Sequence, residues 1–260
     1  MVEGDGESIL LPQLAKLLGR PLEDYGVSII TCDNSGSWKR FARLFLRKDT
    51  SSNHLPIKVC ALRDLDLWPD CAEENDGNEY GFKDHKAKEK GKIGNEGYWL
   101  KNYSVEEIEQ RRKDHKYGLE RNNVKVLISN DWTLEYCLAK HGLFDECYEA
   151  INGNKDDIGN ITGDVENKAT YVQSKVSKTN FPYMLVDILE RELSKDIETE
   201  KSGLTSDQDC EAEASAINRA ERAFSIKLKN KLPSYIVEAI EHVTKPIEDE
   251  AAEVSDDVSL

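Results

Sequence analysis

Three short apolar runs constrain the fold of this chain more than any other feature. They are rich in β-branched residues and span 26–32, 56–62 and 123–129. Each has the length of a strand, and helical patterns lie between them. Runs that are apolar throughout are typical of strands buried on both faces, as in parallel sheets. The alternation therefore predicts an α/β fold with a parallel sheet flanked by helices.

The helical segments carry apolar side chains at intervals of three and four residues. One such stripe precedes Gly19, and a second covers 38–45. Ser104 and Glu107 have the spacing of a capping box, which predicts a basic helix from 105 to about 120. Further helices are predicted for four later segments, 132–140, 181–193, 212–229 and 235–242.

The length of 260 residues allows one main domain with appendages. We expect a catalytic core over 1–150, in which 70–121 forms a long loop and an inserted basic helix. A helical extension over 151–243 is expected to complete the site, and 244–260 to form an acidic disordered tail.

Charge is distributed unevenly along the chain. The net charge of -15 argues against a simple basic nucleic-acid-binding domain. Much of the acid, however, lies in 196–213 and 248–257, whereas 83–125 holds twelve Lys and Arg against eight Asp and Glu. The basic surface is therefore expected in the middle of the chain. Arg112 and Lys116 share a helix face there and are the predicted contacts to DNA phosphates.

Several classes of protein are not expected from the sequence. The longest apolar runs are far shorter than the ~20 residues of a membrane helix, and no export signal is visible, so a cytoplasmic location is expected. The six cysteines form no CxxC pair, which argues against a zinc site or a disulfide framework. No Gly-x-x-x-x-Gly-Lys-Ser/Thr loop occurs, so no ATP site is expected in this chain.

Carboxylates occur where the predicted elements begin and end. Glu3 and Glu7 flank glycines just before the first helix, and Asp64 and Asp66 follow the second apolar run directly. Oxygen ligands of this kind suit a hard divalent cation. Acidic residues at a helix start are also ordinary dipole partners, and Asp-x-Asp occurs by chance in acidic proteins.

Two later residues complete the candidate site. Glu135 follows the third apolar run at the start of a helix, and Lys178 precedes another helix. Taken alone, each is as readily explained as a solvated surface residue.

Together these residues resemble the TOPRIM domain of overcoming-lysogenization-defect (OLD) family nucleases. The matching motifs are Glu3-Gly-x-x-x-Glu7, the apolar strand before Asp64-x-Asp66, Thr133-Leu-Glu135 and, more loosely, Lys178. The similarity runs from residue 2 to about 243. Two departures stand out. The first strand is expected to be truncated, because only Met1 and Val2 precede Glu3, and the ATPase of that family is not recognisable here.

The resemblance implies a metal-dependent DNA endonuclease or nickase with a TOPRIM-like Rossmannoid sheet and additional C-terminal helices. Its two ions, Mg²⁺ or Mn²⁺, would be bound by Glu3, Glu7, Asp64, Asp66 and Glu135. Lys178 would stabilise charge developing on the phosphate. DNA and an ABC-type ATPase domain or subunit are the implied partners.

Two other functions remain open at this point. A truncated TOPRIM module that only binds DNA or a partner ATPase fits the same motifs. The Asp64-Leu-Asp66 element followed by Val126-Leu-Ile-Ser-Asn130 also resembles haloacid-dehalogenase-like phosphatases, although Leu67 stands where they carry Thr or Val.

Overall fold

The structure is a computed structural model of the chain. It describes seven stretches of residues, 1–32, 37–46, 55–72, 99–116, 118–121, 123–202 and 210–246. Of the tail predicted over 244–260, only 244–246 are described, and α10 ends at Thr244. The lysines between 83 and 92 lie outside the described residues.

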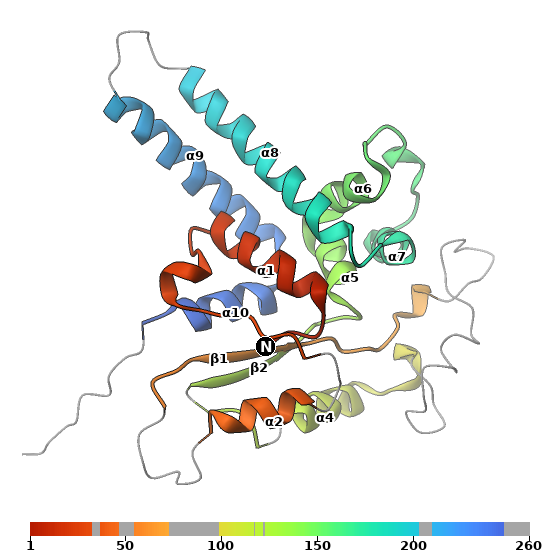
Figure 1. Cartoon of the computed structure of the whole chain (residues 1–260). Helices are drawn as coiled ribbons and strands as arrows, with labels where there is room; N and C mark the ends of the chain where they lie inside the picture. The colour runs from red at the N-terminus through yellow and green to blue at the C-terminus, as the bar shows by residue number, and fades with distance from the viewer. Residues whose placement is uncertain are drawn as a thin grey trace, which may run out of the picture.

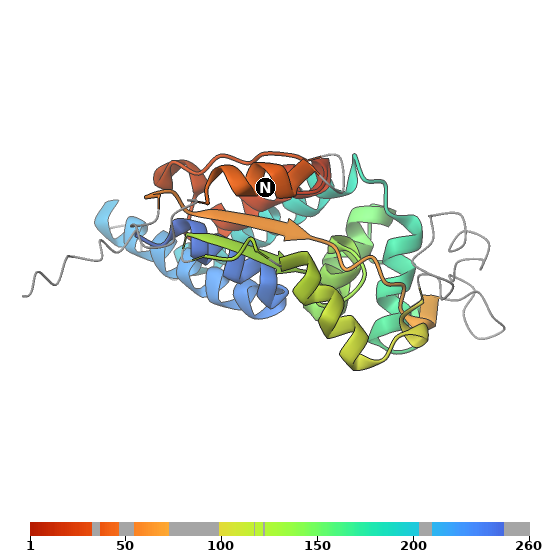
Figure 2. The same ribbon diagram turned by 90° about the horizontal axis from the view of Figure 1, so that it is seen from below.

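Two strands form the sheet among the described residues. β1 (Val59–Arg63) runs parallel to β2 (Val124–Ile128), with Val59 opposite Val124 and Arg63 opposite Ile128. Figure 2 shows both arrows pointing the same way, toward the green helices α5 to α7. The predicted α/β class with a parallel sheet is confirmed, as are the second and third predicted strands to within a few residues.

The first predicted strand, 26–32, is corrected by the structure. Only Thr31 pairs, in a single parallel bridge with Val2. Val2 donates its N–H to the carbonyl of Ile30 and accepts the N–H of Cys32. On the other side, the amino group of Met1 donates to the carbonyl of Cys60, and its carbonyl accepts the N–H of Leu62, both in β1. Met1 and Val2 therefore lie between 30–32 and β1. Among the described residues, no other position of 26–32 forms a bridge.

Helices cover both faces of the sheet (Figure 1). α1 (Asp5–Leu17) and α10 (Ser234–Thr244) lie on one face, and α2 (Ser37–Leu44) and α4 (Val105–Lys116) on the other. The alternation of side chains along a strand explains this, because Cys60 and Leu62 join the core under α1 and α10. Ala61 instead packs in a smaller core with Trp38 of α2.

The remaining helices lie beyond the carboxyl ends of the strands and above α1. They are α5 (Leu134–Leu138), α6 (Phe144–Asn152), α7 (Val165–Lys175), α8 (Phe181–Ser202) and α9 (Cys210–Lys231). α8 and α9 form a long antiparallel hairpin (Figure 1). The predicted helices after 130 are thus present, and α8 continues well past its predicted end at 193.

The larger core contains buried side chains from Val2 to Ile240, so the sheet, α1 and the late helices share it. The predicted boundary at 150 stays a prediction. Among the described residues, no helix combines the length and apolarity that crossing a membrane requires.

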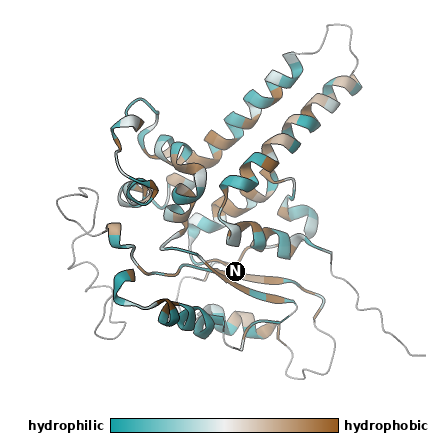
Figure 3. Ribbon diagram, turned by 180° about the vertical axis from the view of Figure 1, so that it is seen from behind, coloured by the Kyte–Doolittle hydropathy of each residue, from teal (hydrophilic) through white to brown (hydrophobic). Residues whose placement is uncertain are grey.

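α4 differs from the other α-helices described here in having no buried residue. Figure 3 shows it coloured mostly as hydrophilic. The capping box predicted for it is present, because Ser104 and Glu107 exchange hydrogen bonds of 2.7 and 3.2 Å. Ile108 packs partly buried against the smaller core, and Arg112 donates to the carbonyls of Ser129 and Asn130 just after β2.

Candidate active site

Three acidic side chains from separate segments meet at the carboxyl end of β1. Asp64 follows the strand directly, Glu7 lies in the first turn of α1 and Glu135 in the first turn of α5. In parallel sheets, this edge is where ligands usually bind, since loops from successive strands open there. The structure thus gathers three of the predicted site residues.

The carboxyl groups of Asp64 and Glu7 are perturbed by this environment. Burial raises the pKa of Asp64 well above its usual range, and repulsion from Glu7 and Glu135 raises it further. Burial also raises the pKa of Glu7 to about 7, with smaller contributions from Glu135 and Glu3. Negative charge at this site is therefore incompletely compensated by the described protein groups.

Glu135 is positioned by the start of α5. Thr133 caps this helix by accepting the N–H of Tyr136, and its hydroxyl donates to Gln173 of α7 at 2.6 Å. Glu135 is only 7% exposed. Its Oε1 lies 3.7 Å from the point where a Cβ on Gly6 would be, so the carboxylate faces the first turn of α1. The positive end of that helix dipole stabilises a carboxylate there.

Glu3 is held by a cation of the protein itself. Nη2 of Arg63 donates to Oε1 of Glu3 at 2.9 Å, and the N–H of Asp64 donates to Oε2 at 3.3 Å. Arg63 is 7% exposed although it is charged. The arginine was not predicted from the sequence as a site residue, because it ends an apolar strand and only the tertiary structure shows its contact with Glu3.

Asp66 lies apart from the buried group. It is exposed, and its φ of 59° places it in the left-handed region, which Asp tolerates better than most residues. The turn before it is fixed to the end of β2, because Leu65 donates its N–H to the Ser129 hydroxyl at 2.9 Å. Asp66 still adds to the field that raises the pKa of Asp64, as the smallest of its sources.

Glu7 also has a purely structural role. Its Oε2 accepts the N–H of Gly4 at 3.1 Å, which satisfies a backbone donor at the start of α1. One carboxylate oxygen is therefore engaged by the start of the helix.

Tyr235 of α10 is a further side chain that the sequence did not single out. It lines a small cavity of about 10 Å³ with Glu7 and Asp64, and it is 5% exposed. Its buried hydroxyl has no hydrogen-bond partner among the described residues. A Tyr within an apolar helix gives no sequence signal of such a position, because the same pattern occurs in ordinary cores.

The remaining predicted residues lie outside the acidic group. Lys178 is exposed in the turn between α7 and α8, without a salt bridge to a described carboxylate. Arg112 donates to the carbonyls of Ser129 and Asn130 at 3.0 and 2.8 Å, and Lys116 lies 3.4 Å from Glu120. The roles of these three residues in phosphate binding stay predictions, and Arg112 has an evident structural role.

The acidic group is not a preformed metal cage. Within the described ranges, no three Asp, Glu, His or Cys side chains stand in an arrangement that could already hold an ion. The convergence of Glu7, Asp64 and Glu135 is seen instead in their mutual effects on the pKa of Asp64 and Glu7, and in the meeting of β1, α1 and α5.

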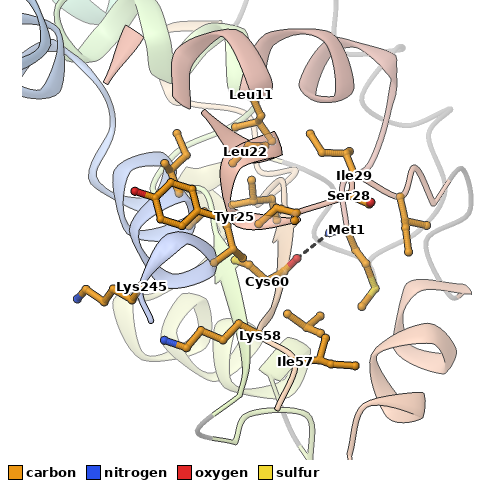
Figure 4. A pocket seen from close by; sticks show the side chains of 18 of the residues that line it. Met1, Leu11, Leu22, Tyr25, Ser28, Ile29, Ile57, Lys58, Cys60 and Lys245 are labelled. Carbon is orange, nitrogen blue, oxygen red and sulfur yellow. Dashed lines mark hydrogen bonds between the residues drawn. The ribbon is translucent and has the colours of Figure 1, made fainter. Parts of the chain in front are cut away.

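A mostly apolar cavity lies elsewhere in the described part of the chain. It has a volume of about 550 Å³ and is lined by Met1, Tyr25, Ile57 and neighbouring residues (Figure 4). None of the predicted site residues lines it.

Comparison with known proteins supports the resemblance seen in the sequence. Residues 1–66 match the family model described as overcoming lysogenization defect protein-like, TOPRIM domain. This stretch contains Glu3, Glu7, Asp64 and Asp66. No curated protein matches the chain.

Two solved structures are similar over most of the chain. Both are titled as the C-terminal region of the Xanthomonas campestris pv. campestris OLD protein, one phased with platinum and one with mercury. The first is 16% identical with a TM-score of 0.34, over 94% of this chain and 89% of that one. The second is 17% identical with a TM-score of 0.36, over 94% and 92%.

Proposed function

We propose that this chain is the catalytic domain of a divalent-metal-dependent DNA endonuclease that hydrolyses phosphodiester bonds. The observation that carries the proposal is the convergence of Glu7, Asp64 and Glu135 at the carboxyl end of β1. The match of residues 1–66 to the OLD-like TOPRIM model supports it.

The residues present fit Mg²⁺ or Mn²⁺. Carboxylate oxygens are the donors that such hard ions prefer. The raised pKa values of Asp64 and Glu7 mean that these carboxylates bind protons more readily than isolated ones do, which neutralises part of the charge in the absence of a cation. A divalent cation would take over that neutralisation. A pair of such ions, when bound, supplies an activated water and stabilises the leaving oxygen.

The chain's own residues would position the substrate and the carboxylates. Arg63 and the Asp64 N–H fix the orientation of Glu3. Asp66, exposed on the adjoining turn, would complete the ligand set. Lys178 would approach the phosphate from the turn before α8. Pro182, at the start of that helix, lies 3.9 Å from the Cβ position of Gly6.

The test is nicking of supercoiled plasmid DNA by the purified chain with Mg²⁺ or Mn²⁺, compared with EDTA. Asp64→Asn and Glu135→Gln should each lower the rate by at least about 100-fold, because each removes a metal-binding charge. Asp5→Asn is the matched control, since Asp5 is exposed in the same first turn of α1 as Glu7. Cleavage that persists unchanged in Asp64→Asn would show that the site is wrong.

A non-catalytic module that binds DNA or a partner ATPase is the second candidate. Two observations favour it, namely the ion pair that engages Glu3 and the absence of a preformed ion cage among the described residues. Metal-dependent stabilisation without nicking would support this alternative. Release of phosphate from small monoesters would instead support a phosphatase.

A further inference from the structure

Unpaired nitrogen atoms gather on the face of the sheet that α2 and α4 cover. Seven buried side-chain atoms of the described residues have no hydrogen-bond partner, and four of them are here. They are Nε and Nη1 of Arg63, Nε of Arg111 and Nδ1 of His115. An unpaired buried polar group costs roughly 1–3 kcal/mol, so this concentration points to an acceptor that comes from outside the chain.

An open cavity of about 480 Å³ lies between the two helices. Its cations come from both of them, Lys39 from α2 and Arg111 from α4. The complete lining is Lys39, Tyr103, Glu107, Gln110, Arg111, Asp114 and His115.

The two carboxylates of this cavity are engaged by their own helix. Glu107 accepts the N–H of Ser104 at 2.7 Å, and Asp114 accepts the side-chain amide of Gln110 at 2.8 Å. Neither has a salt bridge to Lys39 or Arg111 among the described residues. The cations therefore remain available to an external anion.

The pKa of His115 shows the sign of the electrostatic field in the cavity. Burial and, after it, the charges of Lys39, Arg111 and Arg63 lower the pKa of His115 to about 4, whereas Asp114 opposes them more weakly. The positive groups around the ring thus outweigh the negative ones. α2 adds to this field, because it carries Lys39, Arg40 and Arg43 and no acidic residue.

We propose that this cavity binds a backbone phosphate of DNA, with Lys39 and Arg111 as charged ligands and His115 as a hydrogen-bonding ligand. The proposal rests on the proposed nuclease function and identifies where its substrate is held. Arg offers two parallel donors to phosphate oxygens, and Lys acts as a point charge.

The cavity is well placed relative to the carboxylates. Arg63 connects the two sites, because its guanidinium bonds to Glu3 and lies 5.6 Å from the ring of Trp38 in α2. A DNA strand held between α2 and α4 would therefore reach the carboxyl end of β1. Arg112 and Lys116, the contacts expected from the sequence, face other partners and are not part of this cavity.

Binding of a fluorescein-labelled duplex by the full chain tests the proposal. An Asp64→Asn background prevents cleavage, and affinity is measured over a range of salt concentrations. The pair Lys39→Ala with Arg111→Ala should lower the salt slope by about 2, since each lost phosphate contact removes roughly 0.9. The control pair is Arg40→Ala with Lys113→Ala, because both are exposed on the same helices and outside the cavity.

The two pairs remove the same charge, so a general attraction would weaken equally in both. That result would overturn the phosphate site, whereas a loss confined to the cavity pair supports it. Nicking by the otherwise unchanged chain is measured separately. If only the cavity pair weakens DNA binding and no nicking occurs, the phosphate site is supported and the nuclease function is rejected. If nicking occurs and both pairs weaken binding equally, the nuclease function is supported and the phosphate site is rejected.

Inorganic phosphate provides a second probe that does not depend on DNA. An anion in the cavity favours the imidazolium form, so phosphate should raise the pKa of His115 in an NMR titration. The groups facing the ring are Lys39, Arg63, Arg111 and Asp114. The shift should disappear in the Lys39→Ala, Arg111→Ala pair. No shift, or an equal shift in that pair, would contradict the proposal.

Discussion

At the scale of single residues, Glu7 combines two demands that oppose each other. It caps α1 through the N–H of Gly4, which favours the ionised carboxylate, and it is half-buried beside other acids, which favours the protonated form. Burial dominates, because the pKa of Glu7 is raised to about 7. Protonation of Glu7 therefore stabilises the folded, metal-free protein.

The sign of the resulting pH dependence follows from linkage. The pKa of Glu7 is higher in the folded chain than the ordinary value of 4.5, so its stabilising contribution is complete below that value and is lost as pH rises through about 7. The loss is at most about 3 kcal/mol.

Thermal unfolding without metal should therefore occur at a lower temperature at pH 8 than at pH 5. Glu7→Gln should flatten this dependence, and Glu106→Gln, at an exposed position in the first turn of α4, should not. An unchanged pH dependence in Glu7→Gln would mean that its carboxyl is ionised throughout.

Tyr235 permits a second test at this scale. Its hydroxyl is buried without a partner among the described residues, so Tyr235→Phe removes an uncompensated polar group and should raise stability by up to about 1 kcal/mol. Tyr171→Phe is the control, because the Tyr171 hydroxyl donates to Asn152 at 3.1 Å and its loss should cost about 1 kcal/mol. Urea unfolding measures both. Equal losses would show that the Tyr235 hydroxyl is bonded in solution.

At the scale of elements, α4 depends on a polar attachment. Arg112 joins the helix to the end of β2 through the carbonyls of Ser129 and Asn130, and its side chain is 19% exposed. Arg112→Met should therefore destabilise the fold by roughly 1–3 kcal/mol, because the carbonyl of the buried Ser129 and that of the exposed Asn130 both lose a charged donor. Lys113→Met, at an exposed neighbour, should stay within about 0.5 kcal/mol. Equal stability of the two variants would show that the hydrogen bonds of Arg112 do not stabilise the fold.

The sequence predicted elements better than it predicted their partners. β1 and β2, which lie within or overlap the predicted runs, pair with each other along their whole length, so the apolar pattern sufficed to predict them. The run 26–32 has the same pattern, but among the described residues only its Thr31 forms a bridge, because strand pairing is a property of two segments. Arg63 and Tyr235 were missed for a similar reason, since burial next to Glu3 or Asp64 arises only when distant segments meet.

At the scale of the whole molecule, the larger core joins the two halves of the chain. Leu185 of α8 is fully buried in the same core as Leu10 of α1 and Leu62 of β1. The hairpin α8–α9 packs against α1, so the late helices and the sheet are expected to unfold together.

The positions of the tryptophans make this testable. All four, at 38, 68, 99 and 132, precede residue 150, so their fluorescence follows the first half. Circular dichroism is dominated by the long helices of the second half. Leu185→Ala should shift both transitions together, by about 2–5 kcal/mol. Two separate transitions would show that the halves are independent domains.

The charged group of Arg63 contacts residues on two sides, Glu3 near the acidic group and Trp38 of α2. Its guanidinium bonds to Glu3 on one side and faces α2 on the other, and two of its nitrogens remain unpaired among the described residues. A cation that draws Glu3 away would release Arg63 toward an anion, and an anion would likewise loosen its hold on Glu3. Binding at either side then increases affinity at the other. Thermodynamic reciprocity requires that the two increases be the same factor, so substrate and metal would bind cooperatively through the ion pair of Glu3 and Arg63.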